Sequence, residues 1–135
     1  MPRKIPIRDF QRAAEFRTAM RVFLRRSETV AREHDLTPQR YLLLLMVKGA
    51  PDGSERATVG DLAARLQLSQ STVTELVTRS ETAGLVARDH AAGDARVTVV
   101  RLTPEGDRRV VEAMAALGPE RRRLSRVLAT IERVR

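Results

Sequence analysis

The sequence contains no cysteine and no long apolar run. Without thiols, the chain cannot form disulfides, zinc–thiolate sites, a cysteine nucleophile or a thiol redox switch. The longest apolar run, Tyr41–Val47, is far shorter than the ~18 residues that a membrane-spanning helix needs. The N-terminal residues also lack the apolar stretch of a signal peptide, so we expect a cytoplasmic protein with no membrane partner.

Lysine is scarce and arginine is abundant. The chain carries a formal net charge of +8, and only Lys4 and Lys48 among its 25 basic residues are lysines. Guanidinium groups bind phosphate and guanine well, and a basic protein attracts polyanions. The excess charge lies at the two ends, because residues 1–32 carry +6 and residues 121–135 carry +5, whereas residues 33–120 carry −3. Composition therefore permits a nucleic-acid partner but does not locate its binding site.

The length and the hydrophobic pattern predict one mainly helical domain. A chain of 135 residues fits a single domain. Apolar residues at three- and four-residue spacing over residues 9–34 predict a long amphipathic helix. A second, nearly all-apolar helix follows Thr37, and we expect Gly49 to end it in the left-handed conformation. Two further helices follow from residue 104, with a break at Gly118.

A compact pair of helices lies in the middle of the chain. A short apolar-faced helix over residues 59–66 and a turn at residues 67–69 lead to a second helix that reaches about Ala83. The second helix carries small polar residues on its outward face. We expect N-caps, which stabilise helix starts, at Thr37, Thr58, Ser69 and Thr103.

The period of the pattern changes to two after Gly84. Residues 85–88 and 97–102 are rich in β-branched and apolar residues and are predicted to be strands. Residues 89–94 are predicted to form the loop that joins them. A β-hairpin, or wing, therefore follows the helix pair directly.

This order of elements is typical of a winged helix-turn-helix. Its second helix needs small polar residues that can approach base edges in the major groove. The N-terminus of that helix offers backbone N–H groups to a phosphate. The wing needs an arginine that reaches the adjacent minor groove or its phosphates. In this sequence Gln70, Ser71 and Thr74 are the small polar residues of the second helix, and Ser69 marks its N-terminus. Arg88 and Arg96 are the candidate arginines of the wing.

The segment over residues 59–106 also resembles a known family. It reads VGDLAARLQLSQSTVTELVTRSETAGLVARDHAAGDARVTVVRLTPEG. Five features occur in the order and spacing of the MarR family of bacterial transcription regulators. They are LAxxL, SxSTVT, AGLV before the wing, D-x-R within it, and LTxEG after it.

The resemblance implies a mainly α fold with a small β-hairpin wing, in which residues 1–135 form a single domain. Residues 9–34 and 104–134 would be N- and C-terminal dimerisation helices. Residues 37–102 would be the winged helix-turn-helix lobe that binds DNA. It further implies a homodimer that binds a pseudo-palindromic, double-stranded DNA operator and regulates transcription, as a repressor.

Matching by position, the resemblance implies that Asp94 orients Arg96 and that Arg96 enters the minor groove. Two residues depart from the family pattern. Glu75 stands where a basic or neutral residue is usual, and glutamate repels phosphate although it can accept from cytosine N4. Ser80 replaces a leucine of the core, which we expect to loosen the end of the helix. The predicted DNA-binding residues are Ser69, Gln70, Ser71, Thr72, Thr74, Glu75, Arg79, Arg88, Asp94 and Arg96.

Many members of the family bind small aromatic acids or other lipophilic effectors in a cleft between the dimerisation helices and the lobe. The resemblance implies such a cleft here, and an effector in it would release the operator. The same side chains also suit a core or a dimer interface, which is the alternative interpretation. The residues expected near the cleft are Phe16, Met20, Phe23, Arg40, Tyr41 and Leu44.

No group of residues indicates catalysis or metal binding. In the segment Glu33–Asp35, adjacent side chains on a helix diverge by about 100° and do not converge on a metal. The serines and threonines have no histidine or acid at a catalytic spacing, so we expect no enzyme and no cofactor. The alternative function is a winged-helix protein-interaction module with weak or lost DNA binding, which Glu75 and Ser80 favour. Arg79 and Arg88 are either phosphate contacts or local ion-pair partners.

Overall fold

The computed structural model describes residues 2–91 and 93–132, and their side chains except those of residues 91, 94, 95, 131 and 132. Within these ranges the chain forms six helices and one three-stranded antiparallel sheet, which confirms the predicted fold class. None of the described helices is long and apolar enough to cross a membrane. In chain order the elements are α1 (Ile7–Glu33), α2 (Pro38–Lys48), β1 (Arg56–Thr58), α3 (Val59–Leu66), α4 (Gln70–Thr82), β2 (Val86–Ala91), β3 (Asp94–Leu102), α5 (Pro104–Ala116) and α6 (Gly118–Glu132).

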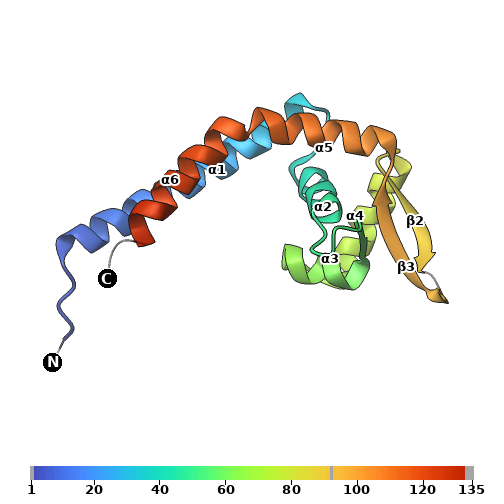
Figure 1. Ribbon diagram of the computed structural model, residues 1–135, viewed down its shortest axis with the longest axis horizontal. Helices are drawn as coiled ribbons and strands as arrows, with labels where there is room; N and C mark the ends of the chain where they lie inside the picture. Colours follow the sequence, from blue (N-terminus) through green and yellow to red (C-terminus); the bar gives the residue numbers. More distant parts are fainter. Residues whose placement is uncertain (1, 92, 133–135) are drawn as a thin grey trace.

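A long arm projects from a lobe (Figure 1). Helices α1 and α6 pack side by side along the arm. The lobe contains α2, α3, α4 and the sheet, and α5 runs from the arm to the base of the wing. The N-terminal end of α1 and the C-terminal end of α6 lie at the far end of the arm, away from the helix-turn-helix.

The predicted N-caps are all present. The hydroxyl of Thr37 accepts from a backbone N–H in the first turn of α2 at 3.2 Å, and that of Thr58 accepts from the N–H of Asp61 at 3.1 Å. The Asp61 carboxylate in turn accepts from the N–H of Thr58 at 3.4 Å, which completes a capping box. Ser69 and Thr103 cap α4 and α5 in the same manner. These residues therefore fix where the helices of the lobe begin.

The prediction for Gly49 is wrong. Its φ is −89°, outside the left-handed region, and its N–H donates to the carbonyl of Leu45 at 2.9 Å. A Cβ at this position would lie 3.0 Å from the Leu45 carbonyl oxygen, so close approach to the backbone, and not handedness, favours glycine. Gly84, just past the end of α4, does adopt the left-handed conformation with φ +77°.

The strands are longer than predicted, and a third strand joins them. β2 continues to Ala91 and β3 begins at Asp94, so the loop predicted over residues 89–94 is wrong. Asp89 and His90 have little strand propensity, but both pair across the hairpin with residues of β3. Strand β1 pairs with the other edge of β3 and was not predicted, because three residues are too few to show an alternating pattern.

The core is centred on α2. Leu43, Leu44 and Val47 of this helix are fully buried, as its apolar composition predicts, whereas Leu42 is 39% exposed. They pack with buried residues of the helix pair, the sheet and α5, which include Leu62, Val73, Val77, Leu85, Val100 and Val110.

The start of α5 presses against the connection between α4 and β2. A Cβ on Gly106 would lie 2.0 Å from the carbonyl oxygen of Leu85, so only glycine fits there. Thr103 donates its N–H to the Leu85 carbonyl at 3.0 Å and its hydroxyl to the Gly84 carbonyl at 2.7 Å. These contacts fasten the end of the wing to the end of α4.

Candidate nucleic-acid interface

Helix α4 has one buried face and one exposed polar face. Val73, Leu76, Val77 and Ser80 are buried against the lobe. All of the predicted base- and phosphate-contacting positions on this helix lie on the exposed side. Those positions are Gln70, Ser71, Thr72, Thr74, Glu75 and Arg79.

The N-terminus of α4 is organised by Ser69. Its hydroxyl accepts from the N–H of Thr72 at 3.2 Å and donates to the Thr72 hydroxyl at 2.8 Å. Ser71 lies close by, with its hydroxyl 3.2 Å from that of Ser69. Thr72 is thus held by the cap, while the first-turn amides give this end of the helix a positive partial charge. Such an end favours an anion.

Glu75 and Arg79 form an ion pair on the exposed face, one helical turn apart. Both side chains are well exposed, at 61% and 68%. The pair neutralises the one positive charge that α4 carries in its last turn. An exposed pair of this kind contributes little to stability, so the guanidinium can exchange Glu75 for a phosphate at small cost.

Arg88 does not lie at the tip of the wing. It projects from β2 towards α4, where its Nη2 donates to the hydroxyl of Thr78 at 2.6 Å. Its Nε lies 3.9 Å from a carboxylate oxygen of Glu81, and its side chain is 33% exposed. Arg88 was predicted to be either a phosphate contact or a local ion-pair partner. In the structure it has local partners on α4.

Arg96 lies on β3 near the end of the hairpin and is exposed. The register of the pairing between β2 and β3 shifts between His90 and Ala91, at this end of the wing. Asp94 begins β3, but its side chain falls outside the described ones, and the predicted contact with Arg96 rests on the resemblance alone. The structure thus brings Arg96 and the exposed face of α4 to the same lobe.

The base of the wing carries charges that the sequence did not single out. Arg101 donates its Nε to Asp89 at 2.6 Å, and Arg56 of β1 approaches the same carboxylate at 3.9 Å. Arg56 and Arg101 are direct cross-strand neighbours. Since like charges opposite each other destabilise a sheet, Asp89 offsets their repulsion. The pairing of β3 with both β1 and β2 brings this group together.

The six residues predicted to line an effector cleft do not gather around one cavity. Tyr41 and Leu44 belong to the core, and burial raises the pKa of the Tyr41 hydroxyl while the charge of Arg121 opposes that rise. Arg40 and Arg79 both line a cleft of about 320 Å³ between α2 and α4. Phe23 lines a cleft of about 120 Å³ between α1 and α6. Phe16 and Met20 are half-buried on α1.

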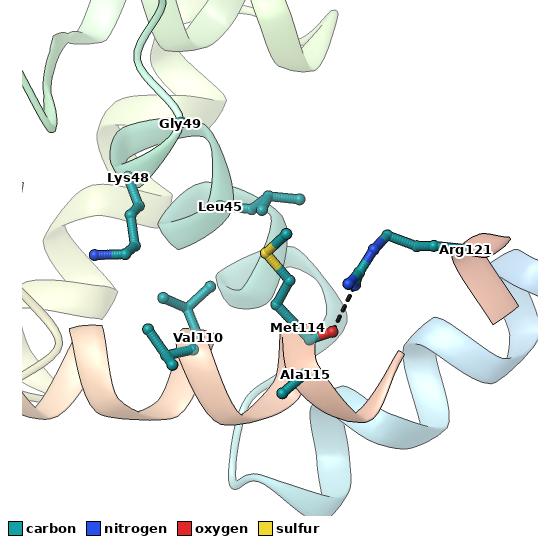
Figure 2. A pocket seen from close by; sticks show the side chains of 8 residues that line it. Leu45, Lys48, Gly49, Val110, Met114, Ala115 and Arg121 are labelled. Carbon is teal, nitrogen blue, oxygen red and sulfur yellow. Dashed lines mark hydrogen bonds between the residues drawn. The ribbon is translucent and has the colours of Figure 1, made fainter. Parts of the chain in front are cut away.

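A larger cavity of about 420 Å³ lies between α2, α5 and α6 (Figure 2). Its walls are mainly apolar, with Leu45, Val110 and Met114 prominent among them. At one side Arg121 donates its Nη1 to the carbonyl of Met114 at 2.5 Å. The residues come from three separate helices, so the only signal for this cavity in the sequence was the apolar stripe of α5.

Lys48 closes the opposite side of this cavity. Its ammonium donates to Asp107 at 2.5 Å and to Glu55 at 2.7 Å. These two hydrogen bonds, that with Asp107 first, raise the pKa of Lys48 above its ordinary value. The charge of Lys48 is therefore matched by two carboxylates. Of the two cations, Arg121 is the one better placed to meet an anion in the cavity.

The helix pair, the polar face of α4 and the wing together define a winged helix-turn-helix protein. Residues 34–97 match the sequence model of the MarR family. The HTH-type transcriptional regulator YsmB of Bacillus subtilis is 27% identical over 93 residues, which are 69% of this chain and 61% of YsmB. The chain therefore spans about three fifths of the length of this curated relative.

Solved structures show the same fold. A MarR family protein from Bacillus stearothermophilus has 27% identity and a TM-score of 0.69, covering 93% of this chain and 83% of that one. Sco3205, a MarR family transcriptional regulator from Streptomyces coelicolor, has 19% identity and a TM-score of 0.71, covering 99% and 89%. The helix-turn-helix region of the chain therefore matches the MarR family of transcriptional regulators, and the fold is shared with solved members of that family, which confirms the resemblance.

Proposed function

We propose that this chain is a homodimeric repressor that binds a pseudo-palindromic operator in double-stranded DNA. The observation that carries the proposal is the exposed polar face of α4 beside a wing that bears Arg96 on the same lobe. Gln70, Ser71 and Thr74 are small enough to let α4 enter a major groove and to hydrogen-bond base edges. In support, the Sco3205 structure is described as a complex with DNA.

The surface of the arm favours a second copy of this chain as the partner in a dimer. Large apolar side chains on α1 and α6 stay exposed although these helices pack on each other, and Phe10 and Leu24 are 58% and 53% exposed. Exposed apolar surface of this kind favours an interface. Two lobes joined through their arms would present two copies of α4 about 34 Å apart, which matches successive major grooves.

Selection from a pool of random duplexes tests the DNA-binding function. A dimeric reader should enrich an inverted repeat whose half-sites are centred about 10 base pairs apart. Its affinity for that duplex should fall steeply as salt rises, because phosphate contacts release counterions. If no sequence is enriched and binding is insensitive to salt, the protein-interaction function is the better one.

The apolar cavity between α2, α5 and α6 supports regulation by a small lipophilic or aromatic acid. A carboxylate near Arg121 would compete with the Met114 carbonyl for its guanidinium. That hydrogen bond joins α6 to the last turn of α5, so its loss would alter the angle between arm and lobe. A ligand that binds one arrangement better shifts the population towards it and releases the operator.

Calorimetry with benzoate and its neutral analogue benzyl alcohol tests this site. The acid should bind more tightly to the wild-type chain and weaken operator binding. In Arg121→Gln the preference for the acid should vanish, while both compounds keep the apolar part of their affinity. Equal preference in the wild type and the variant would place the effector elsewhere.

A further inference from the structure

The wing and α4 are joined by a side chain that projects from the middle of β2. Arg88 stands opposite Val100 of β3, three residues beyond the Thr103–Leu85 contact that fastens the base of the wing. Its guanidinium crosses to α4 and donates to Thr78 at 2.6 Å. The side chain is two-thirds covered, whereas Arg79 on the same surface is mostly exposed.

The acceptor on α4 is itself held in place. The Thr78 hydroxyl donates to the backbone carbonyl of Thr74 at 3.0 Å, so its proton is engaged and its lone pairs face away from the helix backbone. Arg88 meets one of those lone pairs. Glu81, one turn further along α4, lies 3.9 Å from the Arg88 Nε and favours the same placement of its charge. The guanidinium thus has partners on two turns of α4.

We propose that Arg88 is a positioning residue that fixes the angle between the wing and the recognition helix α4. It acts through Thr78 and Glu81 and sets the place of Arg96 relative to Gln70 and Thr74, so that wing and helix fit one operator together. The effect on operator binding rests on the DNA-binding function proposed above. The effect on the angle of the wing in the free protein is independent of that function.

The covered position of Arg88 decides between this role and a phosphate contact. An arginine that binds phosphate gives up hydration, whereas Arg88 would also give up the Thr78 hydrogen bond and the Glu81 charge. A phosphate contact contributes about 0.9 to the slope of log affinity against log salt concentration. A positioning residue contributes nothing to that slope, because it releases no counterion from the DNA.

Binding of Arg88→Ala to the duplex enriched by the wild type tests the proposal. Affinity should fall about tenfold, the usual cost of losing a hydrogen bond to a charged group, with an unchanged salt slope. Thr78→Val should show the same loss, and the double variant should lose no more than either single variant. Thr78→Ser retains the acceptor and should retain the coupling with Arg88.

Arg122→Ala is the matched control, since it removes one exposed arginine from α6, on the arm and away from the wing. Its affinity for the duplex should stay near that of the wild type. A salt slope that falls by about 0.9 in Arg88→Ala, or losses that simply multiply in the double variant, would overturn the proposal.

Hydrogen exchange in the free protein tests the same contact without DNA. Amides of β2 and β3 should exchange about five- to tenfold faster in Arg88→Ala and in Thr78→Val, while α2 and α3 keep their protection. Unchanged exchange in the wing would overturn the proposal even if DNA binding is weakened. If the wild type enriches no duplex but the wing still exchanges faster, the operator function fails and the positioning contact stands.

Discussion

Ser80 of the recognition helix α4 carries a buried hydroxyl that lacks a hydrogen-bond partner among the described residues. The residue is fully buried. A buried hydroxyl without a partner costs free energy that a methyl group of similar size does not. The departure from the family pattern noted in the sequence is therefore a defect in packing chemistry and lies on the side of α4 that faces away from the proposed DNA surface.

We expect Ser80→Ala to raise the free energy of unfolding by about 1 kcal/mol, since it removes the unsatisfied hydroxyl. Urea denaturation of the free protein measures this. Alanine also favours helices more than serine does, so Ser125→Ala at an exposed site of α6 is the control for propensity. A gain in Ser80→Ala no larger than in Ser125→Ala would show that the hydroxyl costs nothing.

Arg96 is the wing residue on which operator binding should depend. We expect Arg96→Ala to weaken binding by about 1–3 kcal/mol, through the loss of its contact with the minor groove or its phosphates. A gel-shift titration on the enriched duplex gives the affinity. Arg122→Ala, which removes an equal charge from an exposed site on the arm, should have a much smaller effect. Equal losses in the two variants would mean that only net charge matters.

The negative charge of Glu75 should reduce the affinity of the recognition helix for DNA of unrelated sequence. Glu75→Gln removes a negative charge from the exposed face and frees Arg79 from its ion pair. Affinity for duplexes of unrelated sequence should rise, and the salt slope should steepen by up to about 0.9 as Arg79 gains a phosphate. Fluorescence anisotropy at several salt concentrations measures both. An unchanged slope would show that Arg79 reaches phosphate even when paired with Glu75.

At the scale of elements, the first turn of α5 is held by a charged cluster. Glu105 accepts hydrogen bonds from Arg108 and Arg109, and these contacts, that with Arg108 first, lower the pKa of its carboxyl to about 2. Its folded pKa lies below that of the unfolded chain. The stabilisation is therefore complete above pH ~4.5 and is lost as the pH falls towards about 2.

We expect Arg108→Ala to raise the pKa of Glu105 and move this loss of stability to higher pH. An NMR titration of the Glu105 carboxyl measures the shift directly. Arg122→Ala, an exposed arginine of α6, should leave the Glu105 titration where it is in the wild type. A Glu105 pKa that does not move in Arg108→Ala would assign the effect to Arg109 alone.

The helices of the lobe could be predicted from the sequence because their signals are local. Thr58 and Ser69 are followed by amides that their hydroxyls reach within one turn, and periodicity sorts the two faces of α4. Contacts that depend on how distant elements meet could not be predicted. Strand β1, the Arg88–Thr78 hydrogen bond and the cavity beside Arg121 all arise from strand register or helix packing, which no local pattern contains.

At the scale of the whole molecule, the arm carries both the excess positive charge and several exposed apolar side chains. The excess positive charge lies in residues 1–32 and 121–135, which include most of α1 and α6, while the stretch over residues 69–101, which includes α4 and most of the wing, is neutral. The proposed DNA binding would therefore depend on the arrangement of a few polar groups on the lobe. The arm contributes in another way, because its exposed apolar residues offer a surface to a second copy.

We expect Leu24→Glu to convert the proposed dimer to a monomer. Leu24 is among the most exposed apolar side chains of α1, and burying one leucine contributes about 1.5–3 kcal/mol, twice over in a symmetric interface. The dimer dissociation constant should therefore rise by at least about 100-fold. Sedimentation at several concentrations measures it, and operator affinity should fall with it because one lobe reads only half of the site.

The control is Thr18→Glu, which adds the same charge at an exposed polar position of α1. It should remain dimeric and bind the operator, since it removes no apolar contact. Circular dichroism should show that both variants keep their helices, because the core of the lobe lies away from these positions. A Leu24→Glu chain that stays dimeric, or a wild-type chain that is monomeric at every concentration, would place the dimer interface elsewhere or remove it.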